Sequence, residues 1–564
     1  MDKMLIPAMI LVPTIAAFLL LIPGKVFDYK KNISALAIIG TLISFVISLV
    51  MAYQFNWADT TMQMTNELPW VAGFGLKFSW GIDSISLWLI LLTTFLMPLI
   101  MLGSYSAFEG REREFYFWLL VLESAMIGTF VATDIIFFYI CFEFTLVPLF
   151  FLIGVFGHDN RLKAAKVFFL YTFTGSMLTF AAILYVAWVF ASNPANGYWS
   201  FQITDLYIAA QGMTDTEQYL VLLGLLAGFA VKVPIFPVHT WLPLAHTEAP
   251  TAGSVILAGV LLKLGTYGIL RFAIPMVPLG VYFFIPWIGA LAVIGIIYAS
   301  LCCWVQTDAK KLVAYSSVAH LGFCVLGLFS FDADNAGTVG AVMYMINHGL
   351  STGALFLCIG MLYERLHTRD MHIMSGMARV MPVWGFFMVF FVCSSVGLPG
   401  LNGFIGEFLT LIGTFTAVDT LGWRFAVPAA SGMIFAAIYL LYLTGHVVWG
   451  PLKIPHVHGK PADWKPNDLN AREIITLVPI AAVCIWLGFA PTPLLESLEA
   501  PIAQLNAPTK EVIPGDNTPA RHRNIETVKQ ELKEHTPAVD IHVTQPHSAL
   551  PAVWEDKTLV AAQQ

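Results

Sequence analysis

Two lysines in long apolar stretches are the residues of this chain that most need a chemical explanation. Lys232 is followed at once by Pro234 and Pro237, so a regular helix cannot continue through this stretch. Lys263 lies within LLKLGTYGIL, a segment without an acidic residue. A lysine at bilayer depth costs about 2.5–3.5 kcal/mol, and a broken helix at that depth is tolerated only where protein or a wet cavity surrounds it. The two lysines therefore indicate a path for ions or protons.

Acidic residues within other apolar segments are candidate partners for these lysines. Glu143, in DIIFFYICFEFTLVPLFFLIG, follows Asp134 by nine residues, which is about 13 Å along a helix and near mid-depth. Glu407 lies at the end of VGLPGLNGFIGEF, where Pro399 and Gly400 predict a second helix break. For Glu123, in LLVLESAMIG, a structural and a functional role are equally consistent with the sequence.

Histidines add groups that titrate near neutral pH and can pass a proton between two ring nitrogens. Four of them fall at or near membrane depth: His239, His246, His320 and His348. For each of them the alternative is an interior histidine with satisfied hydrogen bonds. We favour His320 and His348, because they lie between Lys263 and Glu407 in chain order.

Buried acids and lysines can exchange protons, because burial disfavours both charged forms and the approach of a partner restores them. The alternative is that the same residues form static ion pairs between helices. Two broken helices in a chain with several ionisable groups at membrane depth favour proton transfer. The predicted catalytic set, at similar membrane depth and with water between its members, is Glu143, Lys232, Lys263, His320, His348 and Glu407.

The composition is that of a polytopic membrane protein. The chain has 564 residues, of which 58% are hydrophobic and 12% charged, whereas soluble proteins carry about 25% charged residues. The net charge of −7 describes loops and tail and predicts no nucleic-acid partner. The seven cysteines lie in apolar segments without metal-site spacing, so we expect buried thiols and no bound metal. No phosphate-binding loop, dinucleotide fingerprint or haem ligand pair is present, so no cofactor is expected on this chain.

Apolar runs of about 20 residues predict membrane-spanning helices. Fourteen are expected, near residues 4–23, 33–53, 82–103, 114–132, 134–156, 166–190, 219–243, 250–272, 279–303, 312–331, 336–363, 380–419, 425–449 and 474–494. Odd-numbered connections carry 17 lysines and arginines, and the N-terminus and even-numbered connections carry 4. This bias places the odd connections in the cytoplasm and both termini outside. In this interpretation Lys310 and Lys311 are anchors in a cytoplasmic turn, and Arg271 lies in an outer connection.

The two predicted breaks lie five spans apart, which indicates an inverted repeat of five helices, a plan known among transporters. The fold class expected is an all-α polytopic membrane protein with discontinuous seventh and twelfth helices. The predicted divisions are helices 1–3 (1–113), a first repeat of helices 4–8 (114–272), a second repeat of helices 9–13 (273–449), a cytoplasmic loop with helix 14 (450–499), and a hydrophilic tail (500–564).

Four segments carry a resemblance that spans all fourteen predicted helices. They are VKVPIFPVHTWLPLAHTEAPTAGSVILAGVLLKLGTYGILR, QTDAKKLVAYSSVAHLG, MYMINHGLSTGALFLCIGML and GLPGLNGFIGEF. With these segments the chain resembles the antiporter-like membrane subunits of respiratory complex I, the NADH-quinone oxidoreductase. The family's L and N subunits have a lysine in the twelfth helix where this chain has Glu407, and L continues into a lateral helix that this chain lacks. The tail is longer than the resemblance leads us to expect.

The resemblance implies roles for the candidate residues. Glu143 and Lys232 would form the ion pair of a first half-channel, and Lys263 would be the central relay. His320 and His348 would continue the path to Glu407, the exit group. NADH, FMN, iron–sulfur clusters and quinone would be bound by other subunits, and this chain would be a non-redox subunit of the proton-pumping enzyme. Its partners would be subunits L and N and the lipid bilayer, in a bacterial inner (cytoplasmic) membrane.

Two other functions remain to be weighed. One is a large subunit of a multisubunit sodium/proton antiporter or of a membrane-bound hydrogenase, built on the same fold. The other is a membrane scaffold in which the charged residues only hold helices together. Glu407 favours the complex I subunit over the antiporter, and the broken helices argue against the scaffold.

The charge bias yields a prediction about topology. A reporter that is active only in the cytoplasm should be silent when fused after Gln564, because both termini are expected outside. The same reporter inserted after Lys311, in a connection expected inside, is the positive control. A bright signal after Gln564 would contradict the assignment.

Overall fold

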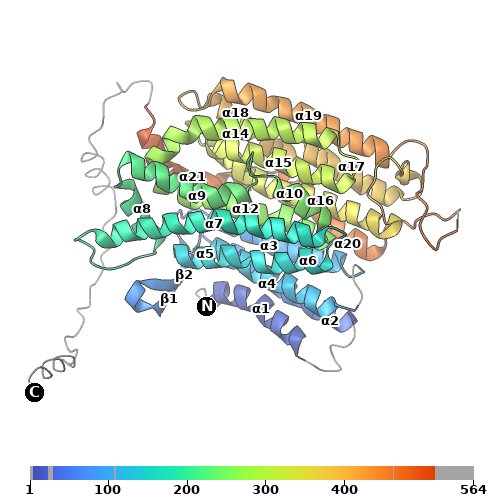
Figure 1. Ribbon diagram of the computed structural model, residues 1–564, viewed down its shortest axis with the longest axis horizontal. Coiled ribbons are helices and arrows are strands. Elements are labelled where there is room, and N and C mark those ends of the chain that lie inside the picture. Colours follow the sequence, from blue (N-terminus) through green and yellow to red (C-terminus); the bar gives the residue numbers. More distant parts are fainter. Residues whose placement is uncertain (1–3, 23–29, 107–109, 462, 515–564) are drawn as a thin grey trace, which may run out of the picture. The chain divides into compact units, whose positions relative to one another are not determined.

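The computed structural model describes residues 4–22, 30–106, 110–461 and 463–514. Most of these residues are helical, and Figure 1 shows the long helices of both predicted repeats running side by side. The helices before the first break are α1 (Leu5–Leu21), α2 (Lys30–Gln54), α3 (Ser84–Gly103), α4 (Glu112–Val131), α5 (Ile135–Phe144), α6 (Leu146–Phe156), α7 (Arg161–Ser192), α8 (Ile203–Gln211) and α9 (Asp215–Lys232). Residues 515–564, most of the predicted tail, lie outside the described residues.

The helices after the first break complete the predicted order. They are α10 (Trp241–Glu248), α11 (Thr251–Ile256), α12 (Leu262–Gly268), α13 (Ile274–Met276), α14 (Pro278–Trp304), α15 (Ala309–Leu328), α16 (Ala336–Leu366), α17 (Pro382–Val396), α18 (Asn402–Thr416), α19 (Trp423–Val447), α20 (Ala471–Phe489) and α21 (Thr492–Val512). Two π-helical turns, η4 (Leu257–Leu261) and η5 (Ile269–Ala273), join α11, α12 and α13 into one span. Two 3₁₀ turns are η3 (Ala72–Phe74) and η6 (Met377–Arg379).

The predicted membrane architecture is confirmed. Among the described residues, 11 helical segments are long and apolar enough to cross a membrane, α5 with α6 and α11 to α13 each counting as one. The shorter helix α1 and two interrupted spans, α9 with α10 and α17 with α18, complete the expected fourteen. Elements outside the spans that were not predicted include helix α8 and an antiparallel hairpin of β1 (Gln63–Val71) and β2 (Leu76–Ile82).

Both interrupted spans break where the sequence predicts, and other groups of the protein satisfy backbone carbonyls that the breaks set free. In the first, Trp241 of α10 donates its indole N–H to the carbonyl of Val231, 3.0 Å away. In the second, Gly397 and Gly400 have positive φ angles of 80° and 92°. At the end of α17, the freed carbonyl of Cys393 accepts a hydrogen bond from the backbone N–H of Leu398 at 3.0 Å. Such partners are what make a broken helix tolerable at membrane depth.

The repeat is visible in matching caps on α5 and α15, although sequence identity between the halves is weak. Asp134 accepts hydrogen bonds from two backbone N–H groups at the start of α5, and Asp308 does the same at the start of α15. Each aspartate also forms an isolated β-bridge, Asp134 with Gln202 and Asp308 with Asp370. An aspartate that satisfies the free N–H groups of a helix start is a strong cap, and the same device begins the second helix of both repeats.

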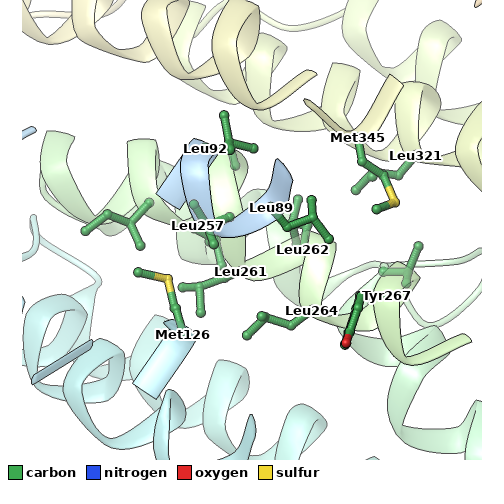
Figure 2. Packing of buried hydrophobic residues seen from close by; sticks show 14 of the residues in the cluster. Leu89, Leu92, Met126, Leu257, Leu261, Leu262, Leu264, Tyr267, Leu321 and Met345 are labelled. Carbon is green, nitrogen blue, oxygen red and sulfur yellow. The ribbon is translucent and has the colours of Figure 1, made fainter. Parts of the chain in front are cut away.

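The centre of the protein is formed by two spans that are buried along nearly all of their length, α16 and the span from α11 to α13. Figure 2 shows leucines of the latter span packed against Leu89 and Leu92 of α3, Met126 of α4 and Met345 of α16. Gly349 of α16 allows the close approach, because a Cβ there would lie 2.7 Å from the carbonyl oxygen of Gly259. Small residues at helix contacts are the usual means of bringing membrane helices together.

Helix α21 runs past residue 500, so the hydrophilic tail begins later than the sequence analysis placed it. Its buried face packs on α3, α13, α14 and α16. Asn506 donates to the hydroxyl of Thr338 at 3.0 Å, and Lys510 donates to the carbonyl of Asp332 at 2.6 Å. This helix therefore belongs to the packed part of the chain.

A buried ion pair fixes one end of the central span. Arg271, which the sequence analysis placed in a connection, lies inside η5 with 4% of its surface exposed and pairs with Asp83. The other carboxylate oxygen of Asp83 accepts from the N–H of Ser86, 2.9 Å away, and caps α3. The guanidinium also lies over the ring of Tyr267. One aspartate thus ties the start of α3 to the end of the central span.

This ion pair yields a stability prediction. Asp83→Ala should destabilise the protein by about 3–5 kcal/mol, because removing one partner leaves a buried charge uncompensated. Lys77→Ala, which breaks the exposed pair of Lys77 and Glu67, is the control and should cost about 1 kcal/mol or less. The measurement is the apparent melting temperature in detergent, and equal melting of the two variants would refute the role of Asp83.

Candidate functional site

Lys263 and His348 meet at the contact of the two fully buried spans. The ammonium nitrogen of Lys263 lies 2.7 Å from Nδ1 of His348, and it also donates to the carbonyl of Ala258. Ala258 lies in the π-helical turn η4 directly before Lys263, and π-helical turns frequently mark functional sites. An ammonium group has only donors, so Nδ1 of His348 accepts. The lysine charge is therefore held by two neutral acceptors without a carboxylate in direct contact.

A second group surrounds Glu407 on α18. Tyr344 of α16 donates to Oε1 of Glu407 at 2.6 Å and also bonds to Nδ1 of His320. His320 lies on α15, with Nδ1 3.7 Å from Oε1 of Glu407. Its other nitrogen, Nε2, lies 3.3 Å from the hydroxyl of Tyr439 on α19. Four helices thus contribute to one hydrogen-bonded group in which every side chain is buried.

The two groups are neighbours. The ring centroids of His320 and His348 are 5.8 Å apart and the rings are inclined by 54°. Lys263, His348, His320, Tyr344 and Glu407 therefore form a nearly continuous series of ionisable side chains. Its one interval without a hydrogen bond lies between the two imidazoles.

A third group is built around Lys232 at the end of α9. The ammonium donates to Oγ1 of Thr145 at 3.0 Å and lies 4.5 Å from the ring centroid of Phe142. Glu143 interacts with Lys232 electrostatically at longer range. The direct Glu143–Lys232 ion pair that the resemblance implied is therefore not formed in this structure, and a threonine hydroxyl takes the lysine instead.

The position of Thr145 follows from the sequence around it. Thr145 separates α5 from α6 within one span. Pro148 has no backbone N–H, so the carbonyl of Phe144 loses its normal helical partner, and the helix is interrupted there. The kink leaves Thr145 beside Lys232.

Several buried polar atoms of these groups have no hydrogen-bond partner among the described residues. They include Oε1 of Glu143, Nε2 of His348, Oε2 of Glu407 and both nitrogens of His246. Buried polar groups in proteins are almost always satisfied, by protein atoms or by ordered water. These atoms therefore mark the positions where we expect water in the interior.

The remaining candidates, all within the described part of the chain, form no hydrogen bond with the series, although His246 lies within electrostatic range of Lys263 and His348. His239 packs against the rings of Phe236 and Tyr298, and His246 stacks on Phe356 with an interplanar angle of 4°. Glu123 is fully buried, and neither carboxylate oxygen has a partner among the described residues.

Three polar residues of the site were not predicted, and Lys310, outside the site, was assigned to the wrong environment. Thr145, Tyr344 and Tyr439 contact the predicted residues. Tyr344 could have been found, because it lies one helical turn before His348 and so shares its face of α16. Lys310 is not an exposed anchor but is 4% exposed, and its ammonium donates to the carbonyl of Ala249.

Nothing in the described part of the chain gathers three histidine, cysteine or acidic side chains at metal-binding distance. The described cysteines are all free. The chemistry that this arrangement supports is proton transfer between side chains.

Comparisons with known proteins concern the family and the fold of this chain. The family described as NADH:quinone oxidoreductase/Mrp antiporter, TM, matches residues 132–443. NADH-quinone oxidoreductase subunit M of Rhodobacter capsulatus is 40% identical over 478 residues, which is 84% of this chain and 90% of the relative. Respiratory complex I from Thermus thermophilus contains a similar chain, with a TM-score of 0.78 and 27% identity over 91% of this chain and 100% of that one. The Mrp complex from Dietzia sp. DQ12-45-1b, with a TM-score of 0.77 and 17% identity over 91% of this chain and 98% of that one, shares the fold.

Proposed function

Because this chain belongs to the membrane family shared by NADH:quinone oxidoreductases and Mrp antiporters, we propose that its buried side chains carry protons between two half-channels. The chain is a proton-translocating membrane-arm subunit of NADH-quinone oxidoreductase, as its subunit M and complex I relatives show. Glu407 and the missing lateral helix, which set this chain apart from subunits L and N, predict subunit M, and these relatives confirm that prediction. The roles of the individual residues are our proposal.

The observation that carries the proposal is the contact between Lys263 and His348. The ammonium lies 2.7 Å from Nδ1 of the imidazole, and both side chains are buried within the protein. Placing a charged lysine at this depth in the membrane costs free energy. If Lys263 served only to hold helices together, we would expect a carboxylate beside it, because a buried charge is tolerated best next to an opposite charge. A neutral histidine instead offers a site to which the lysine proton can pass.

In the proposed path, Lys232 and Glu143 belong to the first half-channel, Lys263 is the central relay, and Glu407 is the exit group. The hydroxyl of Thr145 holds Lys232 while it is not paired with Glu143. If Lys232 alternates between Thr145 and Glu143, the electrostatic potential at Lys263 changes. We propose that this change couples the first half-channel to the central relay.

The remaining assignments concern the complex as a whole. We propose that subunits L and N flank this chain, and that NADH, FMN, iron–sulfur clusters and quinone are held by other subunits, so that this chain performs no redox step. We further propose a bacterial inner-membrane location with both termini on the outer side. The lysine and arginine bias supports this orientation.

The second candidate function is proton/sodium exchange, which the likeness to the Mrp complex raises. That likeness rests on 17% identity and so concerns the fold alone. Sodium transport would require oxygen ligands around the ion. The central group offers a lysine and two imidazoles, which favours protons.

A substitution at Glu143 tests the proposed function. Glu143→Gln should lower proton pumping and quinone reductase activity of the assembled complex by at least about a hundredfold, the lower end of the range for loss of a proton-transfer group. Glutamine keeps the size of the side chain but cannot ionise, so burial would leave Lys232 in its neutral form. Pumping is measured in proteoliposomes with a pH-sensitive dye.

Two variants control this experiment. Glu143→Asp keeps the charge on a shorter arm and should retain more activity than Glu143→Gln. Glu67→Gln removes an exposed carboxylate of the hairpin and should have little effect. A fully assembled Glu143→Gln complex that pumps at the normal rate would overturn the role of Glu143 and return the scaffold function to consideration.

A further inference from the structure

The hydroxyl of Tyr344 lies between two of the proposed proton carriers. It donates to Oε1 of Glu407 at 2.6 Å, and it bonds to Nδ1 of His320. The direct separation of Nδ1 of His320 from Oε1 of Glu407 is 3.7 Å, which is too long for a hydrogen bond. The hydrogen-bonded connection between imidazole and carboxylate therefore runs through the phenol.

The directions of these hydrogen bonds follow from the number of protons available. An ionised carboxylate only accepts, so Tyr344 uses its single O–H toward Glu407. The phenol oxygen must then accept from His320, which places the imidazole proton on Nδ1. In the neutral ring, Nε2 is then an acceptor, and the hydroxyl of Tyr439 supplies the donor at 3.3 Å. The three hydrogen bonds, from Tyr439 to His320, from His320 to Tyr344 and from Tyr344 to Glu407, therefore all donate in the direction of Glu407.

From this arrangement we propose that Tyr344 is the catalytic residue that transfers the proton from His320 to Glu407, an inference that rests on the proposed function of the site. When His320 gains a proton at Nε2, its Nδ1–H bond breaks and a new O–H bond forms on Tyr344. The original O–H bond of Tyr344 breaks at the same time, and that proton binds Oε1 of Glu407. His320 ends neutral, Tyr344 ends unchanged, and the positive charge that entered has neutralised the carboxylate.

The proton for this step is available from the neighbouring histidine. Nδ1 of His348 accepts from the ammonium of Lys263, so the proton of neutral His348 resides on Nε2. That nitrogen is buried without a partner among the described residues. The ring of His348 lies 5.8 Å from that of His320, centroid to centroid. A small movement or one water molecule would complete the connection.

The backbone holds Tyr344 and Glu407 in fixed register. Gly406, the residue before Glu407, packs so closely on α16 that a Cβ would lie 2.8 Å from the Cα of Tyr344. The ring of Tyr344 also meets His320 edge to face, with ring centroids 5.8 Å apart. These contacts leave the phenol little freedom to rotate away, which is what a positioned proton-transfer group requires.

The experiment uses the whole complex in proteoliposomes and compares three substitutions. Tyr344→Phe should lower pumping and quinone reduction by about tenfold or more, with normal assembly on native gels, because it removes the hydroxyl and keeps the ring. Tyr363→Phe removes a hydroxyl from the same helix outside the site and should leave both rates unchanged. Glu407→Gln should fail as Tyr344→Phe does, since it removes the proton acceptor.

The outcomes separate this inference from the proposed function. If Tyr344→Phe pumps normally while Glu407→Gln fails, the role of Tyr344 is wrong and the proposed function stands. If both pump normally, the proposed path through Glu407 fails as well. A merely structural role is tested by the solvent deuterium isotope effect on residual pumping, which should rise in Tyr344→Phe and would stay constant if the tyrosine only packs.

A second variant covers the case in which Tyr344→Phe does not assemble. Difluorotyrosine at position 344 keeps the shape and the hydroxyl but makes the phenol more acidic. If the phenol carries the proton, the pH profile of pumping should be displaced from that of the unmodified complex. A profile that coincides with the unmodified one would overturn the inference.

Discussion

The structure depends on a positive charge that has neither bulk water nor a carboxylate beside it. The ammonium of Lys263 is held by the imidazole of His348 and by the carbonyl of Ala258, inside two spans that are buried along nearly all of their length. Charge in such surroundings is stable only with well-placed donors and acceptors. The π-helical turn before Lys263 and the close approach at Gly349 are the local features that bring these acceptors into place.

The other elements can be understood as support for this centre. The cap and ion pair of Asp83 fix α3 against the end of the central span. Each interrupted span brings one ionisable residue to the interior, Lys232 where α9 ends and Glu407 in the first turns of α18. Because Trp241 and the backbone N–H of Leu398 satisfy carbonyls freed at the breaks, the breaks are stable parts of the fold and can position charged groups in the membrane.

Much of this fold could be predicted from the sequence, because its strongest signals are local. Apolar length gave the spans, and proline and glycine located both breaks. The candidate residues Lys263, His320, His348 and Glu407 do lie in one connected series.

What could not be predicted depends on contacts between distant segments. The contact of Lys232 with Thr145 requires the kink before Pro148 and the packing of α5 against α9, which no local pattern reports. The spacing of Tyr344 to His348 could have marked it as a candidate, but its position opposite Glu407, which gives it a role, is a contact that only the structure shows. Lys310 and Arg271 were assigned by charge counting, which does not distinguish a loop from a buried helix end.

The most direct test of the central claim is a map of ordered water in the intact complex. Oε1 of Glu143, Nε2 of His348 and Oε2 of Glu407 are buried without partners among the described residues, and a proton path requires water at such atoms. Electron cryo-microscopy at a resolution that shows water should reveal density within hydrogen-bond distance of each atom. Dry, closely packed apolar contacts at all three atoms would contradict the account.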